Sequence, residues 1–203
     1  MRAIVYISAL YFLLPLELLH AGDDEKDRER AERRLRNLET RANGVAAAAV
    51  GAEHAGFLQR ETRRLLKRCR EHALSSYEFD RLLEAMDDLL DVRDDLHAAA
   101  RQKPETGTDK REETEKRSVT AKRLERAYFR VQQAEYFARL SAEKQAPEYI
   151  TLSRQIYQRA RAAYDARDYG RAMKLASASG EMVNVLENLA QAAVRRPEPP
   201  ILK

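Results

Sequence analysis

The amino-acid sequence predicts an all-α protein. Charged residues make up 34% of the 203-residue chain, Trp is absent, and Gly and Pro number only 7 and 6. No stretch alternates apolar and polar residues at a period of two over more than a few positions, so strands are not expected. Apolar residues instead recur at intervals of three and four, which is the spacing of one buried helix face.

The apolar pattern of one half of the chain recurs in the other half, at an offset of about ninety residues. The matching segments are 35–49 with 124–138, 58–73 with 149–164, and 79–100 with 169–190. All three pairs match in order, and the register slips only at predicted turns. We therefore predict a duplication, in which two tandem three-helix units pack as one helical bundle or as two small bundles.

The N-terminal residues have the layout of a secretory signal. An apolar run over 3–14 follows a basic start, and a short stretch beyond Pro15 ends at Ala21. Pro15 and Glu17 interrupt the run, which stops short of the ~20 residues that cross a bilayer. We predict a signal peptide over 1–21, export to the periplasm or the extracellular space, and no membrane span in the mature chain.

Residues 22–103 form the first predicted three-helix unit. Basic side chains dominate between Phe57 and Ala73, and carboxylates crowd the next helix between Asp80 and Asp95. Helices of opposite sign suit an antiparallel hairpin, although each exposed pair contributes under ~1 kcal/mol. The carboxylates lie off the apolar seam, so we expect them to be solvated with ordinary pKa values, which argues against acid-base catalysis.

Residues 104–118 mix both charges with Pro104 and Gly107 and have no apolar period. This composition predicts a charged linker, with helix after Asp109 as the alternative. The second three-helix unit is predicted over 119–195, and a proline-rich extended tail over 196–203. Three residues mark expected helix starts: Ser75, Pro147 and Asp168.

Candidate ligands for a metal or a catalytic centre are few. Cys69 and His72 are one helical turn apart, as are Asp94 and His97. A structural zinc site needs four such ligands, and a di-iron bundle needs paired Glu-x-x-His motifs with further Glu. We predict no enzyme activity and no cofactor, and we expect Cys69 to be a buried small hydrophobe. The alternative is a bundle that binds a metal or small ligand through Cys69, His72 and His97.

The net charge of +4 and the pI of about 9.2 raise the question of nucleic-acid binding. A nucleic-acid protein needs an unopposed basic stripe that neutralises phosphates. The two signs are mixed along this chain instead, so we predict no nucleic-acid partner.

The segment 122–140 carries more apolar surface than a helix with one buried face requires. One stripe consists of Leu124, Ala127, Tyr128, Val131, Ala134 and Ala138, and a second of Phe129, Tyr136, Phe137 and Leu140. We expect this helix to be central in the bundle, with its second stripe covered by other helices. The alternative is that the second stripe is exposed and is the interface for a partner.

Ala146-Pro147-Glu148-Tyr149, the stretch from Ala163 to Ala172, and Leu175-Ala176 resemble the helical hairpins of uncharacterised small bacterial envelope proteins and, more distantly, tetratricopeptide repeats. The resemblance covers about fifty residues and implies an envelope-located helical protein, without any functional residue. The duplication and the surplus stripe together predict an exported interaction or scaffold protein that binds a protein partner or assembles with itself.

Overall fold

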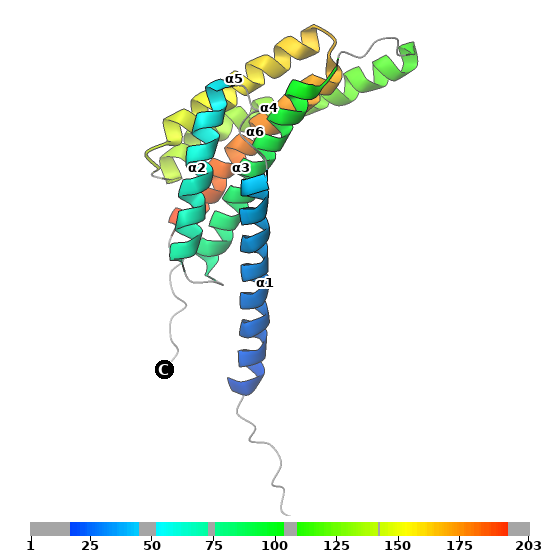
Figure 1. The fold of residues 1–203 in the computed structure, drawn as a ribbon. Coiled ribbons are helices and arrows are strands. Elements are labelled where there is room, and N and C mark those ends of the chain that lie inside the picture. Colours follow the sequence, from blue (N-terminus) through cyan, green and yellow to red (C-terminus); the bar gives the residue numbers. More distant parts are fainter. Residues whose placement is uncertain (1–16, 45–51, 73–75, 104–108, 142, 195–203) are drawn as a thin grey trace, which may run out of the picture.

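The computed structural model describes residues 17–44, 52–72, 76–103, 109–141 and 143–194, and within these residues it contains six α-helices and no strand (Figure 1). The helices are α1 (Glu17–Gly44), α2 (Ala52–Glu71), α3 (Tyr77–Arg101), α4 (Lys110–Ser141), α5 (Ala146–Asp165) and α6 (Tyr169–Ala193). The predicted all-α fold is confirmed. None of these helices combines the length and apolarity that crossing a membrane requires.

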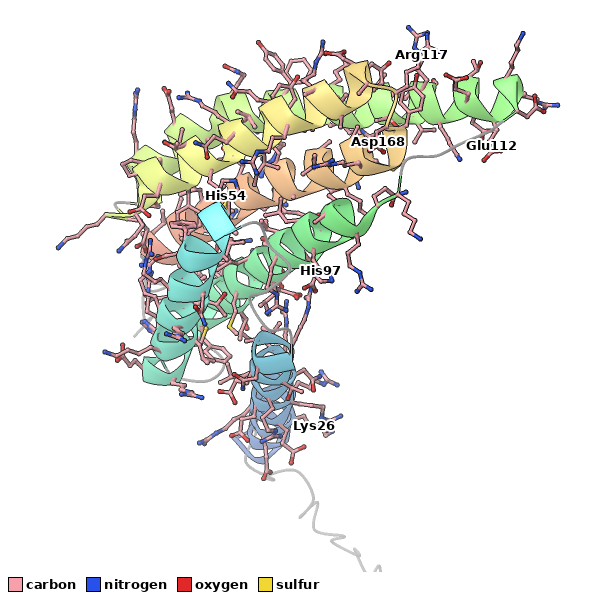
Figure 2. The ribbon with its side chains drawn as sticks, turned by 45° about the horizontal axis from the view of Figure 1, so that its top comes forward. Lys26, His54, His97, Glu112, Arg117 and Asp168 are labelled. Carbon is pink, nitrogen blue, oxygen red and sulfur yellow. The ribbon has the colours of Figure 1, made fainter. Side chains whose placement is uncertain are left out.

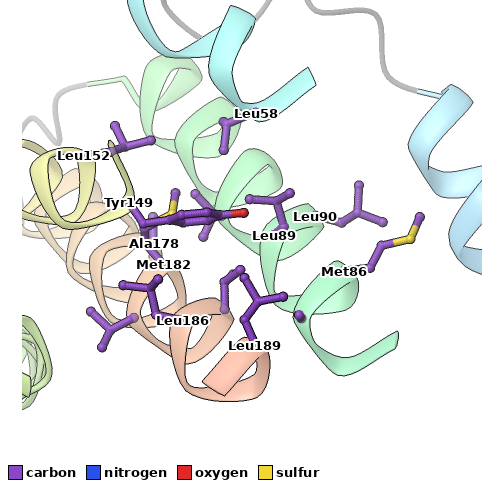
Figure 3. Packing of buried hydrophobic residues seen from close by; sticks show 14 of the residues in the cluster. Leu58, Met86, Leu89, Leu90, Tyr149, Leu152, Ala178, Met182, Leu186 and Leu189 are labelled. Carbon is purple, nitrogen blue, oxygen red and sulfur yellow. The ribbon is translucent and has the colours of Figure 1, made fainter. Parts of the chain in front are cut away.

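Helices α3 and α6 form the central antiparallel pair of the bundle. Lys174 of α6 donates to Asp95 near the end of α3 at 3.0 Å, and Arg81 near its start donates to Gln191 at 3.1 Å. Between these contacts the two helices share a seam of fully buried apolar side chains, among them Leu89 and Leu186 (Figure 3). Removal of this seam from water is the main stabilising contribution that the two helices share.

Each half of the chain places its first and third helices in the same direction. Arg34 of α1 pairs with Glu84 of α3 at 2.7 Å, and Arg41 further along α1 reaches Asp94 at 2.6 Å. In the second half, α4 runs beside α6 and α5 returns antiparallel to both (Figure 1). Matched positions of the two halves share their burial, as at Phe79 with Tyr169, Leu82 with Ala172 and Met86 with Ala176. This agreement fits a duplication without establishing one, and the duplication stays a prediction.

A buried polar contact joins the two halves through α2 and α5. The Tyr149 hydroxyl donates to Glu61 Oε2 at 3.0 Å, and Arg64 Nε donates to the same oxygen at 2.8 Å. Arg64 also pairs with Glu143 at 2.6 Å, and the Phe57 ring meets the Tyr149 ring edge to face at 5.0 Å. Because these polar groups satisfy one another, the carboxylate of Glu61 is tolerated in a nearly inaccessible position.

The predicted pairing of charges between α2 and α3 is wrong in its main part. The arginines of α2 pair chiefly with Glu143 and with Glu148 of α5. The aspartates of α3 meet Arg34 and Arg41 of α1 instead. The sequence correctly indicated that α2 is basic and α3 is acidic. In the structure, however, the polar side of each helix faces another neighbour, and the two sets of charges do not meet.

Helix starts follow the expected cap chemistry with one shift. The hydroxyl of Ser76, rather than Ser75, accepts from Phe79 N at 3.1 Å at the start of α3. Asp168 caps α6 by accepting from Arg171 N at 3.2 Å, and Pro147 stands in the first turn of α5, both as predicted.

The structure describes only part of the expected domain boundaries. Helix α4 begins at Lys110, so the second part of the predicted linker is helical, as the alternative had it. Helix α1 begins at Glu17, inside the predicted signal peptide. Residues 1–16, 104–108 and the tail 196–203 lie outside the described residues.

Candidate functional site

The outer face of α4 carries the most exposed aromatic side chains of the described chain. Phe129, Tyr136 and Leu140 are 59%, 62% and 45% exposed. Their spacing of seven and four residues places them on one side of α4, opposite the buried positions Ala127 and Val131. We call these three residues the α4 ridge. The expectation that other helices cover the second stripe is wrong for them, because α5 and α6 pack against the opposite side of α4.

Phe137, the fourth residue of the predicted interface, has a different environment. Its ring is partly buried and packs against the hydrophobic core. The Tyr136 ring meets it edge to face at 5.4 Å, and the Arg130 guanidinium carbon lies 5.4 Å from its centre. Phe137 is therefore partly covered by the core and by Arg130, and its ring contacts the ridge residue Tyr136.

Ion pairs on both sides of the ridge join α4 to its two neighbours. On one side Arg130 pairs with Glu187 of α6 at 2.5 Å, and on the other Glu135 pairs with Arg154 of α5 at 2.6 Å. The apolar seam beneath α4 includes Leu124. Because α4 is fixed to both neighbours, the ridge is presented on a rigid support.

A groove of about 510 Å³ lies between α4 and α6 beside the ridge. Phe129 stands at its edge, and three arginines of α4 line it: Arg123, Arg126 and Arg130. Gly180 and Glu181 line it from α6. We call this space the α4–α6 groove. Its volume is within the range of about 300–1,000 Å³ that small ligands or a few partner side chains occupy.

Gly180 leaves the groove open on the α6 side. A Cβ placed on Gly180 would meet no atom within 4 Å. Glycine in a helix interior costs about 0.5–1 kcal/mol relative to alanine, and no packing contact at this position requires it. A larger side chain would therefore extend into the groove without disturbing the helices.

Two carboxylates at the α3–α6 interface have strongly perturbed acidity. Burial raises the pKa of Asp88 to about 7, and the neighbouring carboxylates of Glu84 and Asp91 add to the effect, while a 2.8 Å hydrogen bond from Asn188 opposes it. Burial likewise raises the pKa of Glu181 to about 7. The expectation of solvated, unperturbed carboxylates is thus wrong for Asp88, because α3 is buried on more sides than its seam alone indicates.

The sequence contained a signal for this wider burial. Apolar residues on α3 outside the repeated seam, among them Leu83, Leu90 and Val92, are all buried. A helix with apolar residues over so wide an arc has neighbours on several sides. No comparable sequence signal pointed to the α4–α6 groove, since its arginines and Gly180 come from helices that only the fold brings together.

The alternative ligand set receives no support from the geometry. Cys69 is fully buried, and burial raises the pKa of its thiol to about 11, so the thiolate form is disfavoured. His72 lies 3.4 Å from Glu78. His97 lies on α3 (Figure 2), away from Cys69 on α2, and its neighbour is Arg101 of the same helix at 3.3 Å. Within the described ranges, no group of three or more His, Cys, Asp and Glu side chains is placed to hold a metal ion.

Comparisons with protein-family models, with curated proteins and with solved structures find no match for this chain. The resemblance to tetratricopeptide-like hairpins of envelope proteins therefore stays a prediction.

Proposed function

We propose that this chain is an exported bacterial interaction or scaffold module that binds a protein partner, or a second copy of itself, through the outer face of α4. The observation that carries the proposal is the α4 ridge, with Phe129 and Tyr136 both more than half exposed. Aromatic side chains are enriched at protein interfaces, where they dominate binding energy. The proposal assigns the chain no catalytic activity and no cofactor.

Export is the second part of the proposal. It is supported by the apolar run over 3–14 and the small residue Ala21 at the expected cleavage position. The implied location is the periplasm or the extracellular space, in agreement with the envelope resemblance.

The size of the ridge is appropriate for a contact of moderate strength. Full burial of one large apolar side chain contributes about 1.5–3 kcal/mol relative to its exposure to water. Phe129, Tyr136 and Leu140 would therefore be the energetic centre of an interface, and their polar neighbours would form its rim.

Self-assembly is tested by light scattering coupled to size-exclusion chromatography. The variant is the double substitution Phe129→Ser and Tyr136→Ser, with circular dichroism to confirm that it is folded. If the chain assembles through the ridge, the wild type has the mass of an oligomer and the folded variant has that of a monomer.

A different partner is tested in the cell that naturally produces the protein. A photo-cross-linking residue replaces Tyr136 in one variant and Gln158 of α5, which is also exposed, in the control. We expect a discrete adduct from position 136 only. A wild-type monomer that gives equal adducts from both positions, or none from either, would contradict the proposed interaction surface.

A further inference from the structure

We infer that the partner segment bound by the α4 ridge is acidic, and that it seats an apolar side chain in the α4–α6 groove beside arginines of α4. This inference rests on the proposed function and specifies the chemistry of its partner. The partner is a protein segment from another chain, with carboxylates along one edge and at least one large apolar side chain.

The charge of α4 is the first support. Basic side chains outnumber acidic ones between Lys116 and Arg139. Among the described residues, Arg126 forms no hydrogen bond or ion pair, and Arg123, which lines the same groove, interacts only electrostatically with Glu181. Glu181 is the acidic residue in the lining, and with a pKa of about 7 it is only partly charged at neutral pH. An incoming carboxylate would therefore meet available guanidinium groups, with which it forms strong hydrogen bonds.

The shape of the groove is the second support. Phe129 forms one edge, while Ala176, Ser177 and Gly180 on α6 are small and leave the space open. An apolar side chain seated there would contact the Phe129 ring and the α6 backbone. The same segment would then extend along the ridge towards Tyr136. Peptide-binding grooves use the same combination, in which a pocket holds an apolar side chain and charged residues recognise the rest of the peptide.

An anionic membrane surface is the competing occupant, and the charge pattern argues against it. Glu125 is exposed on α4 four residues before Phe129, on the same side of the helix, and would be repelled by anionic headgroups. The three groove arginines lie only on the α6 side. A helix that lies on a membrane has basic residues along its polar face instead. The groove arginines line a narrow space, which an acidic segment can enter and a flat bilayer surface cannot.

Variants at Gly180 separate groove occupancy from folding. Gly180→Leu fills the groove, and Gly180→Ala is the matched control that changes the same position while leaving most of the space free. Both replace a helix-interior glycine with a better helix former, so both are expected to fold. Arg126→Glu reverses one positive charge of the groove lining, and Phe129→Ser removes the groove edge and part of the ridge.

The probe is a library of random peptides displayed on phage, selected on the immobilised full chain and counter-selected on Gly180→Leu. We expect the enriched peptides to carry an excess of Asp and Glu together with Phe, Leu or Trp. In fluorescence anisotropy, the best peptide should bind wild type and Gly180→Ala equally. Its affinity should fall about tenfold or more with Gly180→Leu and with Arg126→Glu. A copy of the peptide with Asn and Gln in place of its acids should lose affinity similarly.

Other outcomes overturn the inference in distinguishable ways. Enriched peptides that are neutral or basic, or no enrichment over Gly180→Leu, would refute the acidic partner and the groove. The ridge would still be an interaction surface if Phe129→Ser abolished binding of those peptides. Binding that survives every substitution would contradict the proposed function as well. Sedimentation with phosphatidylglycerol vesicles that depends on Arg126 and Phe129, without peptide selection, would assign the surface to a membrane.

Discussion

Helices α1 and α4 are the first helices of the two halves, and different forces hold them in place. Helix α4 buries an apolar seam that includes Leu124, Val131 and Ala134. Helix α1 buries only Ala31 and Leu38 among the side chains that the structure describes. Its N-terminal part extends away from the other helices, with Lys26 in solvent (Figures 1 and 2).

Charge contacts replace most of the missing apolar seam in the first half. The guanidinium of Arg41 bonds to Asp87 at 2.8 Å, to Asp94 at 2.6 Å and also to Asp91. Arg93 of α3 donates in return to the backbone carbonyl of Arg41 at 3.0 Å. Exposed ion pairs are weak and screened by salt, whereas apolar burial is not. The first helix of a three-helix unit is therefore firmly packed in the second half, as α4, and easily detached in the first half, as α1.

The largest expected effect comes from shortening an apolar side chain beneath α4. Leu124→Ala should lower the free energy of unfolding by about 3 kcal/mol, because the buried side chain leaves a cavity in the seam. Leu38→Ala on α1 is the matched variant and should cost about 1 kcal/mol, since α1 can detach without unfolding the rest. Urea denaturation followed by circular dichroism measures both values, and equal losses would break the comparison between the two helices.

Arg41→Gln should weaken the attachment of α1 by about 2 kcal/mol, because three aspartates lose their common partner. Hydrogen exchange measures this as faster exchange in α1 with unchanged protection in α4. The control is Arg36→Gln on the same helix, where the side chain is exposed and forms only a 3.6 Å pair with Glu32. High salt should reproduce the effect of Arg41→Gln in the wild type. Equal loss of protection in α4 would show that α1 does not open independently.

The central helices should respond to pH through Asp88. Its folded pKa of about 7 lies above the ordinary value of ~3.9, so the folded state holds an extra proton between these values. Stability from this group is therefore greatest below pH ~4 and is lost as the pH rises through 7. Asp88→Asn should raise stability by about 1.5 kcal/mol at pH 8 and leave it nearly unchanged at pH 4.

Asp91→Asn is the control for this pH dependence. Asp91 bonds to Arg41, so its loss should lower stability at neutral pH, which is the opposite sign. Thermal unfolding of wild type and both variants across pH 4 to 8 measures these stability differences. A constant difference between Asp88→Asn and wild type at all pH values would show that the Asp88 carboxyl does not titrate in this range.

The smallest effect is expected at the turn between α5 and α6. Arg167 has a φ of 63°, and hydrogen bonds from Arg167 N to Tyr164 O and from Asp168 N to Ala163 O close the end of α5. Glycine is the usual residue in this left-handed position. Arg167→Gly should therefore stabilise the second half by about 1 kcal/mol, measured as a rise in the urea midpoint. Arg167→Ala keeps the strained backbone and should give no gain.

Sequence reasoning reached the helical class, the six helices and most of their buried positions. Phe79, Leu89, Ile156 and Leu186 were on predicted seams and are fully buried. The burial of Cys69 was also predicted correctly. The predictions of burial failed where they depended on which neighbours cover the second face of a helix. Asp88 was expected to be solvated and is largely buried, and the ridge residue Phe129 was expected to be covered and is exposed.

The sequence by itself determined local structure in this protein, because helix periodicity and cap residues act over a few neighbouring positions. Tertiary structure alone decided that the second stripe of α4 is exposed, that α1 rather than α2 neutralises the aspartates of α3, and that Gly180 opens a groove beside arginines. These properties depend on how many neighbours each helix has and on which side. Such information is distributed over residues far apart in the chain and becomes readable only when the helices are packed.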